Sequence, residues 1–360
     1  MGIRIAEAAN HLLGQEVVPH LWNTATLAGD LRHRSAQPPR PRADVEADAI
    51  AAKYAPGPLP RGGIVTDADR PVADLALEMI AAALSAGTLV ICDENVRVCA
   101  RCGHMTGTGA HACRACGNAT TRAHRTEHLV AERDPARPVL EREDIHVYRR
   151  RPPLQLRNAA GNAPTRLILS RTREHGISLA PVGLPGLVLD PRAGLHVAVL
   201  AAARQLRAEV AVMTTTANAA INIAAHGQPF RTHQGLRLRY ALHGHVPYEH
   251  THLLAQLCES HRADAATQAA FEMWFLPLYA LKEKNGVHSG QLPALFTHFI
   301  RTRRARPARP DPAVLADIRQ AVQAGDPGWV MRQTALVHAM ASTWAPRPRS
   351  STTSPGPSLT

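Results

Sequence analysis

Two cysteine pairs, Cys99-Ala-Arg-Cys102 and Cys113-Arg-Ala-Cys116, stand ten residues apart, and a glycine follows each pair. This pattern is typical of a zinc knuckle, in which tight turns direct backbone amides at the sulfurs and two turns supply four thiolates. We therefore predict one Zn²⁺ bound tetrahedrally by the four cysteines. Because a closed four-sulfur site leaves no position for a substrate, this metal would stabilise the structure and take no part in catalysis.

The cysteines also allow other interpretations. A pair of disulfides or a redox-active Cys-x-x-Cys would use such pairs, but two matched turns fit a metal site better. His104 and His111 are alternative ligands that a complete set of four thiolates makes unnecessary. The remaining cysteines, Cys92 and Cys258, are predicted to be buried thiols rather than ligands.

The composition limits the class of protein. A length of 360 residues suits about two domains, and we find neither a secretory signal pattern nor an apolar run long enough to cross a membrane. Thiolate zinc ligands favour a reducing compartment, so we expect a cytoplasmic protein. The formal net charge of +12, nearly all from arginine, favours polyanionic partners such as RNA. The basic run from Arg301 to Arg309 could contact RNA phosphates or form a solvated loop.

Helix signals are clearest just before the cysteines. Apolar residues recur at helical spacing over 71–86, with Asp69 as the expected cap and Gly87 as the stop, and 88–92 then has the pattern of a short strand. We further predict helices at 3–13 and 195–209, and strands at 17–22, 167–169, 177–179, 187–190 and 210–213. From Leu236 onward we predict helices, at 250–262, 264–281, 291–302, 312–324 and 328–343, before a disordered tail at 346–360.

Five segments, taken in order along the chain, carry a family resemblance. They are the helix 71–86 with the strand that leads to Cys99, Thr126-Glu-His-Leu129, Ser170-Arg-Thr-Arg-Glu-His-Gly-Ile177, Asp190-Pro-Arg-Ala-Gly194, and Leu238-Arg-Tyr-Ala-Leu242 followed by Val246-Pro-Tyr248. Together they resemble the class I aminoacyl-tRNA synthetases of the methionyl type.

The resemblance implies an α/β fold, with a Rossmann-type nucleotide-binding domain that contains an inserted zinc knuckle and is followed by an α-helical domain. On this basis 1–92 and 129–235 would form the two parts of the Rossmann-like domain, 93–128 the insertion, 236–345 the helical domain and 346–360 the tail. The chain begins at or just after the position of the family's His-Ile-Gly-His motif, so the first strand of the family fold is expected to be missing.

The resemblance also implies a pocket for ATP and an amino acid, with Zn²⁺ as a structural cofactor. Its residues would be Arg171, Asp190, Gly194, Met213, Thr214, Thr216 and Asn218. Asp190 would lie near the ammonium group of the amino acid, and 213–218 would stand where the family has its Lys-Met-Ser-Lys-Ser loop. The lysines of that loop, which stabilise the triphosphate charge, are absent here. Arg171 and Arg173 are the nearest arginines that could supply positive charge instead.

Three functions therefore remain open. The first is an aminoacyl-tRNA synthetase-like ligase that activates an amino acid with ATP and transfers it to tRNA, slowed by the loss of the lysines. The second is a stand-alone ligase that passes an activated amino acid to a small-molecule acceptor in a biosynthetic pathway. The third is a catalytically inactive paralogue that keeps the fold and the zinc to bind RNA or a protein.

Overall fold

A computed structural model describes residues 20–22, 64–67, 69–106, 111–113, 116–141, 144–146, 161–173, 176–208, 211–244, 250–276 and 289–302, and three isolated helical positions at 313, 316 and 320. The predicted helices at 3–13 and 328–343, most of that at 312–324, and the tail at 346–360 lie outside these residues. Among the helices that are described, none is long and apolar enough to span a membrane.

A set of parallel strands lies at the centre of the α/β part. Strand β11 (Leu236–His243) pairs in parallel with β9 (Ala211–Thr216) and β5 (Ile145–His146), and forms an antiparallel hairpin with β10 (Thr232–His233). The prediction that the chain is helical from Leu236 onward is wrong for this segment. Large apolar residues recur at every second position of β11, and Leu238 and Tyr240 are buried, which is the period of a strand rather than a helix.

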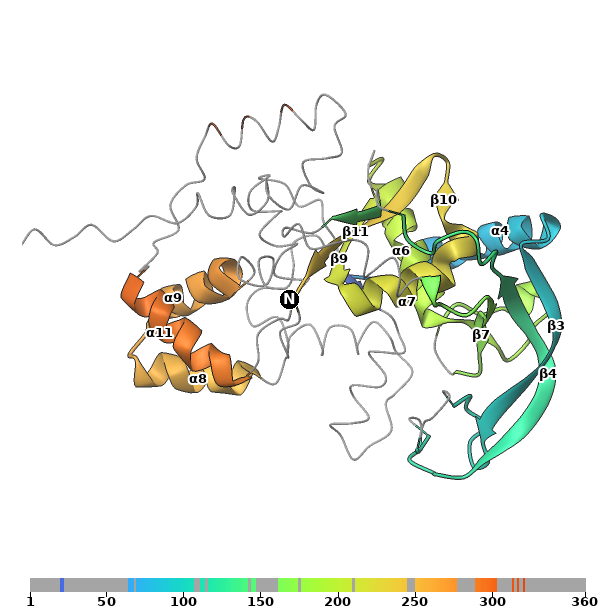
Figure 1. The fold of residues 1–360 in the computed structure, drawn as a ribbon, viewed down its shortest axis with the longest axis horizontal. Helices are drawn as coiled ribbons and strands as arrows, with labels where there is room; N and C mark the ends of the chain where they lie inside the picture. The colour runs from blue at the N-terminus through green and yellow to red at the C-terminus, as the bar shows by residue number, and fades with distance from the viewer. Residues whose placement is uncertain are drawn as a thin grey trace, which may run out of the picture.

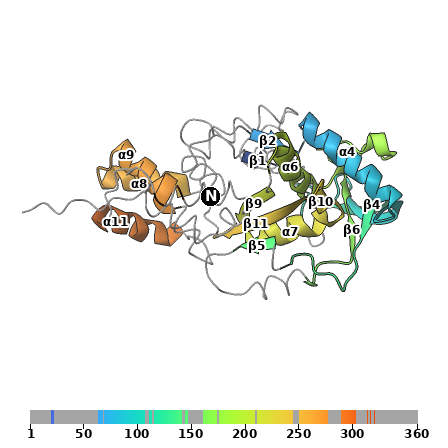
Figure 2. The same ribbon diagram turned by 90° about the horizontal axis from the view of Figure 1, so that it is seen from above.

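Helices pack against these strands (Figures 1 and 2). Helix α6 (Pro191–Gln205) contacts β9 and β11, α7 (Ala217–Gly227) contacts α6 and the same strands, and α4 (Arg70–Ser85) packs against α6. Helix α6 begins at Pro191, four residues before the predicted 195, because Asp190 caps it. The core of this part lies between these three helices and the strands, and it is rich in alanine, valine and leucine.

Helix α4 agrees closely with its sequence prediction. Its buried residues are Val72, Leu75, Ala76, Met79, Ile80 and Ala83. Asp69 occupies the N-cap position, but its carboxylate accepts hydrogen bonds from the backbone N and the Oγ1 of Thr66, at 3.0 and 2.9 Å, rather than from the helix. Gly87 follows the helix with a φ of 70°, a left-handed conformation that glycine adopts without strain.

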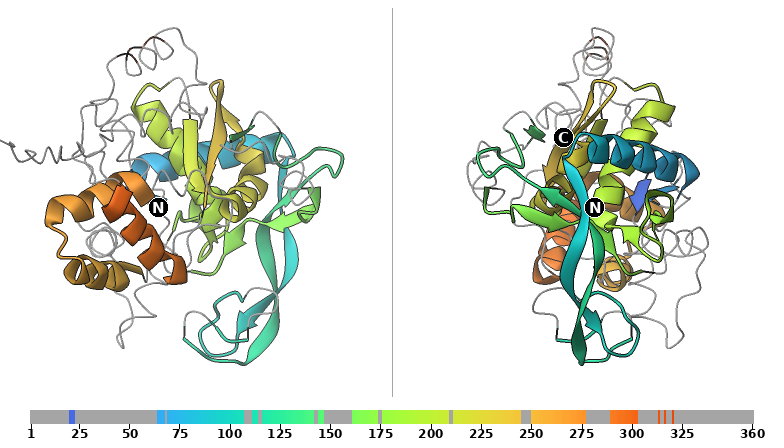
Figure 3. Two further views of the ribbon diagram at one scale, coloured as in Figure 1. Left: turned by 60° about the vertical axis from the view of Figure 1, so that its left-hand side comes forward. Right: turned by 90° about the vertical axis from the view of Figure 1, so that its right-hand side faces the viewer.

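A long antiparallel hairpin projects from the body as an arm (Figure 3). Strand β3 (Leu89–Cys99) pairs with β4 (Thr121–Glu132) along its whole length, and β6 (Arg166–Ile168) adds a third strand at the base. The strand predicted at 88–92 is therefore too short. Polar residues from 93 to 95 concealed the continuation, although Val96, Val98 and Cys99 beyond them are buried again. Both limits of the predicted insertion, 93 and 128, lie inside these strands.

Short strand pairs complete the α/β part. Strand β1 (His20–Trp22) is parallel to β2 (Ile64–Thr66), and β7 (Ser170–Arg171) is antiparallel to β8 (Val188–Leu189). The strand predicted at 177–179 is reduced to a single bridge between Ser178 and Val188. Short 3-10 turns are present at Ala180–Val182 and Gln228–Phe230.

A separate group of helices follows β11 and lies away from the sheet (Figure 2). It contains α8 (His250–Ser260), α9 (Ala265–Ala270) with its π-helical continuation Phe271–Phe275, a 3-10 turn at Ser289–Gln291, and α11 (Leu292–Thr302). The ring of Phe271 lies 4.9 Å from that of Phe296 and 5.2 Å from that of Phe299, centroid to centroid. These buried rings form the local core of the helical group.

Candidate functional site

Two matching backbone turns build the cysteine site at the tip of the arm. The N–H of Gly103 donates to the carbonyl of Cys99 at 3.0 Å, and the N–H of Gly117 donates to the carbonyl of Cys113 at 2.8 Å. Both glycines have left-handed backbones, with φ of 71° and 74°, and a Cβ at either position would introduce strain. The glycine after each cysteine pair is therefore required by the turn itself.

The four sulfur atoms of Cys99, Cys102, Cys113 and Cys116 lie within 4.8 Å of one another. The Sγ atoms of Cys99 and Cys116 are 3.5 Å apart, and those of Cys102 and Cys113 are 3.6 Å apart. Thiolates about 2.3 Å from a central Zn²⁺ would be about 3.8 Å from one another, so both the spacing and the donor atoms fit a zinc ion. Hydrogen bonding from the backbone of Cys102 lowers the pKa of Cys99 to about 6, whereas burial raises the pKa of Cys102, so the surroundings favour the thiolate form of Cys99 but not that of Cys102.

The other predictions for cysteine and histidine have mixed outcomes. None of the six cysteines forms a disulfide, and the metal-binding group among the described residues includes neither His104 nor His111. Cys258 is buried, as predicted. Cys92 is only half-buried, so the prediction of a buried thiol is wrong there. It lies on the arm, where the guanidinium of Arg166 approaches its sulfur to 3.2 Å.

Thr172 connects the first cysteine turn to the body of the protein. Its Oγ1 accepts a hydrogen bond from the N–H of Met105 at 2.6 Å and donates one to the carbonyl of Gly103 at 3.1 Å. Thr172 directly follows Arg171, the last residue of strand β7, so the residue that holds the cysteine turn is the chain neighbour of that arginine.

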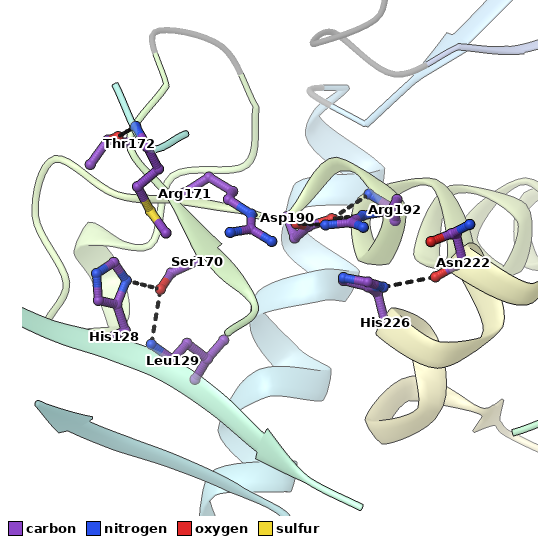
Figure 4. Close-up of polar contacts among 10 residues, drawn as sticks. His128, Leu129, Ser170, Arg171, Thr172, Asp190, Arg192, Asn222 and His226 are labelled. Atoms are coloured by element: carbon purple, nitrogen blue, oxygen red, sulfur yellow. Dashed lines mark hydrogen bonds and ion pairs between the residues drawn. The ribbon is translucent and has the colours of Figure 1, made fainter. Parts of the chain in front are cut away.

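Asp190 is the centre of a second cluster of charged residues (Figure 4). Its side chain is 1% exposed, and Oδ1 accepts from the backbone N and the Nε of Arg192, both at 2.9 Å. Oδ2 accepts from the Nη2 of Arg192 at 2.8 Å and from the Nε of Arg171 at 2.6 Å. Four donors therefore surround one carboxylate, which caps α6 and also holds two arginines.

The charges of this cluster are fixed by their surroundings. Burial by itself would raise the pKa of Asp190, but the hydrogen bonds of Arg192 and the charges of Arg171 and Arg192 outweigh burial and hold that pKa well below its usual range. Asp190 is therefore ionised at neutral pH. One negative and two positive charges leave the cluster with a net charge of about +1.

His226 approaches the same cluster from the last turn of α7 (Figure 4). Its Nδ1 lies 2.8 Å from the carbonyl oxygen of Asn222. Because a carbonyl can only accept, Nδ1 carries the proton of the neutral ring. Burial lowers the pKa of His226 to about 4, so this histidine adds no charge to the cluster at neutral pH.

Gly194 has a packing role in the first turns of α6. A Cβ at this position would lie 3.0 Å from the Cβ and 3.3 Å from the Oδ2 of Asp67. Asp67 follows strand β2 and is 1% exposed. The missing side chain therefore allows α6 to approach the end of β2 closely.

The segment 213–218, which the resemblance places at the family's Lys-Met-Ser-Lys-Ser loop, is a junction between a strand and a helix. Met213 and Thr214 lie in β9, Thr216 caps α7 by accepting from the N–H of Ala219 at 3.4 Å, and Asn218 is in the first turn of α7. The prediction of a loop here is wrong, because the three threonines extend the β pairing with β11 as far as His243. Their side chains are half-buried.

Two buried histidines that the sequence did not single out have structural roles. His196 Nε2 donates to the carbonyl of Phe230 at 3.1 Å, which leaves Nδ1 to accept from the hydroxyl of Tyr240 at 3.3 Å. Burial lowers the pKa of His196 to about 4. His128 Nδ1 lies 2.7 Å from Ser170 Oγ, and both side chains are fully buried. This serine–histidine pair joins β4 to β7 and is closed to any substrate.

The structure divides the predicted pocket residues into two sets. Arg171 lies beside Asp190, and Gly194 is in the next turn of α6. The second set, at 213–218, lies at the end of β9. In the described part of the chain no hydrogen bond or ion pair joins the two sets, although α6 packs on β9. Arg192 and His226 were missed as members of this cluster. Arg192 is only two residues from Asp190 in the sequence, whereas nothing in the sequence relates His226 of α7 to it.

Comparisons with known proteins identify the fold. No family model matches the sequence, and no curated protein is detectably similar to it. A crystal structure of Mycobacterium tuberculosis methionyl-tRNA synthetase bound by methionyl-adenylate is similar with a TM-score of 0.54 and 12% identity, over 95% of this chain and 79% of that chain. A second structure of that enzyme in complex with methionyl-adenylate has a TM-score of 0.53 and 14% identity, over 95% and 78% of the two chains. At such low identity the likeness concerns the fold alone, and the chain has a mixed α/β fold similar to that of a class I aminoacyl-tRNA synthetase.

Proposed function

We propose that this protein is a class I, methionyl-type aminoacyl-tRNA synthetase-like ligase, which binds ATP and an amino acid in the cytoplasm and forms an aminoacyl-adenylate slowly. The observation that carries the proposal is the similarity of fold, over 95% of the chain, to synthetase structures that hold methionyl-adenylate. The proposal includes transfer of the aminoacyl group to tRNA, which the strongly basic composition favours.

The arrangement of β9, β11 and α7 supports a nucleotide site of the Rossmann type. In open α/β sheets, ligands bind beyond the carboxyl ends of parallel strands. Strand β9 ends at Thr216 and leads directly into α7, so the Thr216 hydroxyl and the N-terminus of α7 lie at that edge. We assign Met213, Thr214, Thr216 and Asn218 to the nucleotide side of the pocket.

The proposed domain order follows the resemblance, with one change. The Rossmann-like domain would extend through β11 to His243, and the helical domain would begin at α8 instead of at residue 236. The zinc knuckle would form the tip of the arm inserted between the two parts of the nucleotide-binding domain.

We assign a structural Zn²⁺ to the four cysteines of the arm. When bound, this ion would supply four metal–sulfur bonds and no catalytic chemistry, because the cysteines fill its tetrahedral positions. The position of the ion would be set by the two turns that end in Gly103 and Gly117, and by the hydrogen bond from the Thr172 hydroxyl to the carbonyl of Gly103.

The expected rate of adenylation is low because residues 213–218 contain no lysine. Each lost contact to the charge that develops in a transition state typically reduces the rate by about 10²–10³. The absence of lysine from residues 213–218 also favours a second candidate function, that of a binding module that keeps the fold but catalyses no reaction.

ATP–pyrophosphate exchange with each proteinogenic amino acid in turn tests the proposal. A weak exchange that depends on one amino acid would support the ligase, and its absence with every amino acid would favour the binding module. Adding tRNA or hydroxylamine then distinguishes transfer to tRNA from transfer to a small acceptor. A preparation of the Arg171→Ala variant controls for synthetases from the expression host, whose activity would persist in it.

A further inference from the structure

The cluster around Asp190 has more positive charge than its carboxylate can neutralise. All four contacts to the carboxylate come from Arg171 and Arg192, and three of them are charged N–H donors. An ammonium group placed beside Asp190 would therefore have to displace a guanidinium and would meet a second one. The geometry disfavours the cation that the family resemblance assigns to this position.

Several nitrogen atoms of the two guanidinium groups do not contact Asp190. Arg171 uses only Nε for Asp190, and Arg192 uses Nε and Nη2. Within the described residues, Nη1 and Nη2 of Arg171 and Nη1 of Arg192 make no hydrogen bond or ion pair. Their side chains are 23% and 37% exposed, so these remaining donors can reach a ligand while being partly shielded from water.

Three features favour the binding of an anion by these donors. The buried carboxylate fixes the position of both guanidiniums, so little side-chain entropy is lost when a ligand binds. Both arginines lie at the N-terminal end of α6, a helix of 15 residues whose dipole adds positive potential there. Helix α7, which packs beside them, contains no carboxylate, and its His226 is neutral with its pKa lowered to about 4, so α7 offers no negative charge to offset the arginines.

We propose that Arg171 and Arg192 together bind a small oxyanion, the phosphate or carboxylate group of a ligand, with Asp190 as the positioning residue that orients both guanidiniums. Guanidinium groups bind such anions by paired, charge-assisted hydrogen bonds. The proposal does not rest on adenylation, since a simple anion binds without turnover.

Calorimetric titration of the full-length, zinc-loaded protein with inorganic phosphate tests the site, with a parallel titration of acetate to identify a carboxylate site. Arg192→Gln keeps the length of the side chain and one donor for Asp190, and it should weaken anion binding at least about tenfold. Arg204→Gln is the matched control, because Arg204 is an exposed arginine of the same helix, and it should bind as the parent does. Arg171→Gln repeats the test from strand β7 if the first variant does not fold.

Four results would overturn the proposal. Equal binding by the parent and the Arg192→Gln variant would remove Arg192 from the site, and an equal loss in Arg204→Gln would reveal a general effect of charge. Failure of both phosphate and acetate to bind the parent would exclude an oxyanion site. A third titration with ethylamine completes the test, since amine binding that Asp190→Asn abolishes would assign the site to a cation.

Discussion

Replacing Asp190 by alanine tests the account of the charged cluster most severely. The change removes the cap of α6, which typically costs about 1 kcal/mol, and it leaves two arginines without their carboxylate. Breaking a fully buried ion pair costs about 3–5 kcal/mol. The guanidiniums here are 23% and 37% exposed, so a smaller loss of about 2 kcal/mol is appropriate. We expect Asp190→Ala to lower the free energy of unfolding by about 3 kcal/mol.

Asp190→Asn separates the two contributions, because asparagine caps a helix nearly as well as aspartate. It should lose about 2 kcal/mol, the ionic part alone. The pKa of Asp190 is lowered in the folded state, so the stability it contributes is fully present above the unfolded pKa of about 4 and is lost as the pH falls below that value. The difference between the parent and Asp190→Asn should therefore shrink in acid.

Urea unfolding followed by far-UV circular dichroism, at constant zinc concentration, measures these differences. Asp264→Ala is the matched control, since Asp264 caps α9 by accepting from the N–H of Thr267 at 2.7 Å. It should lose about 1 kcal/mol, the typical cost of a lost cap. If Asp190→Ala costs no more than Asp264→Ala, the two arginine contacts contribute nothing and the reasoning is refuted.

Four further outcomes are expected. Removal of zinc by a chelator should unfold the arm and lower the melting temperature, because structural zinc contributes folding free energy; metal analysis that finds no zinc in the purified protein would contradict this. Thr172→Val removes both hydrogen bonds to the first cysteine turn and should make zinc easier to extract in a competition with a chelator dye. Gly227→Ala should destabilise the fold by about 1–3 kcal/mol, since its Cβ would lie 2.2 Å from Nδ1 of the buried His196, whereas Gly290→Ala meets nothing within 4 Å and should fold normally. His196 and His226 both have pKa values lowered to about 4, so unfolding should take up protons between about pH 6.5 and pH 4, and the urea midpoint should fall as the pH is lowered through that range.

Sequence reasoning succeeded where the signal is local. The cysteine turns depend on residues within five positions of one another, and the glycine that closes each turn is visible in the sequence. Helix α4 is similarly determined by its own apolar stripe and by Gly87. In both cases neighbouring residues specify the structure, so no knowledge of the rest of the fold is needed.

Sequence reasoning failed where distant segments decide the structure. Strand β11 was predicted as helix, although its large apolar residues alternate, because its identity depends on pairing with β9 and β5. The arm was predicted too short for the same reason, since β3 and β4 stabilise each other across a long loop. The site at Asp190 gathers Arg171, Arg192 and His226 from three elements, and no spacing in the sequence relates His226 to the others.

Formation of the adenylate in a single turnover tests the central claim most directly. Enzyme in excess over radiolabelled ATP, with methionine or another amino acid, is sampled over hours, and labelled aminoacyl-adenylate is separated from ATP and AMP. The account predicts a product that depends on the amino acid and accumulates far more slowly than the turnover of about 1–10³ s⁻¹ typical of enzymes. No adenylate above the control without amino acid would contradict the ligase assignment, and formation at a typical enzyme rate would contradict the inferred loss of phosphate contacts at 213–218.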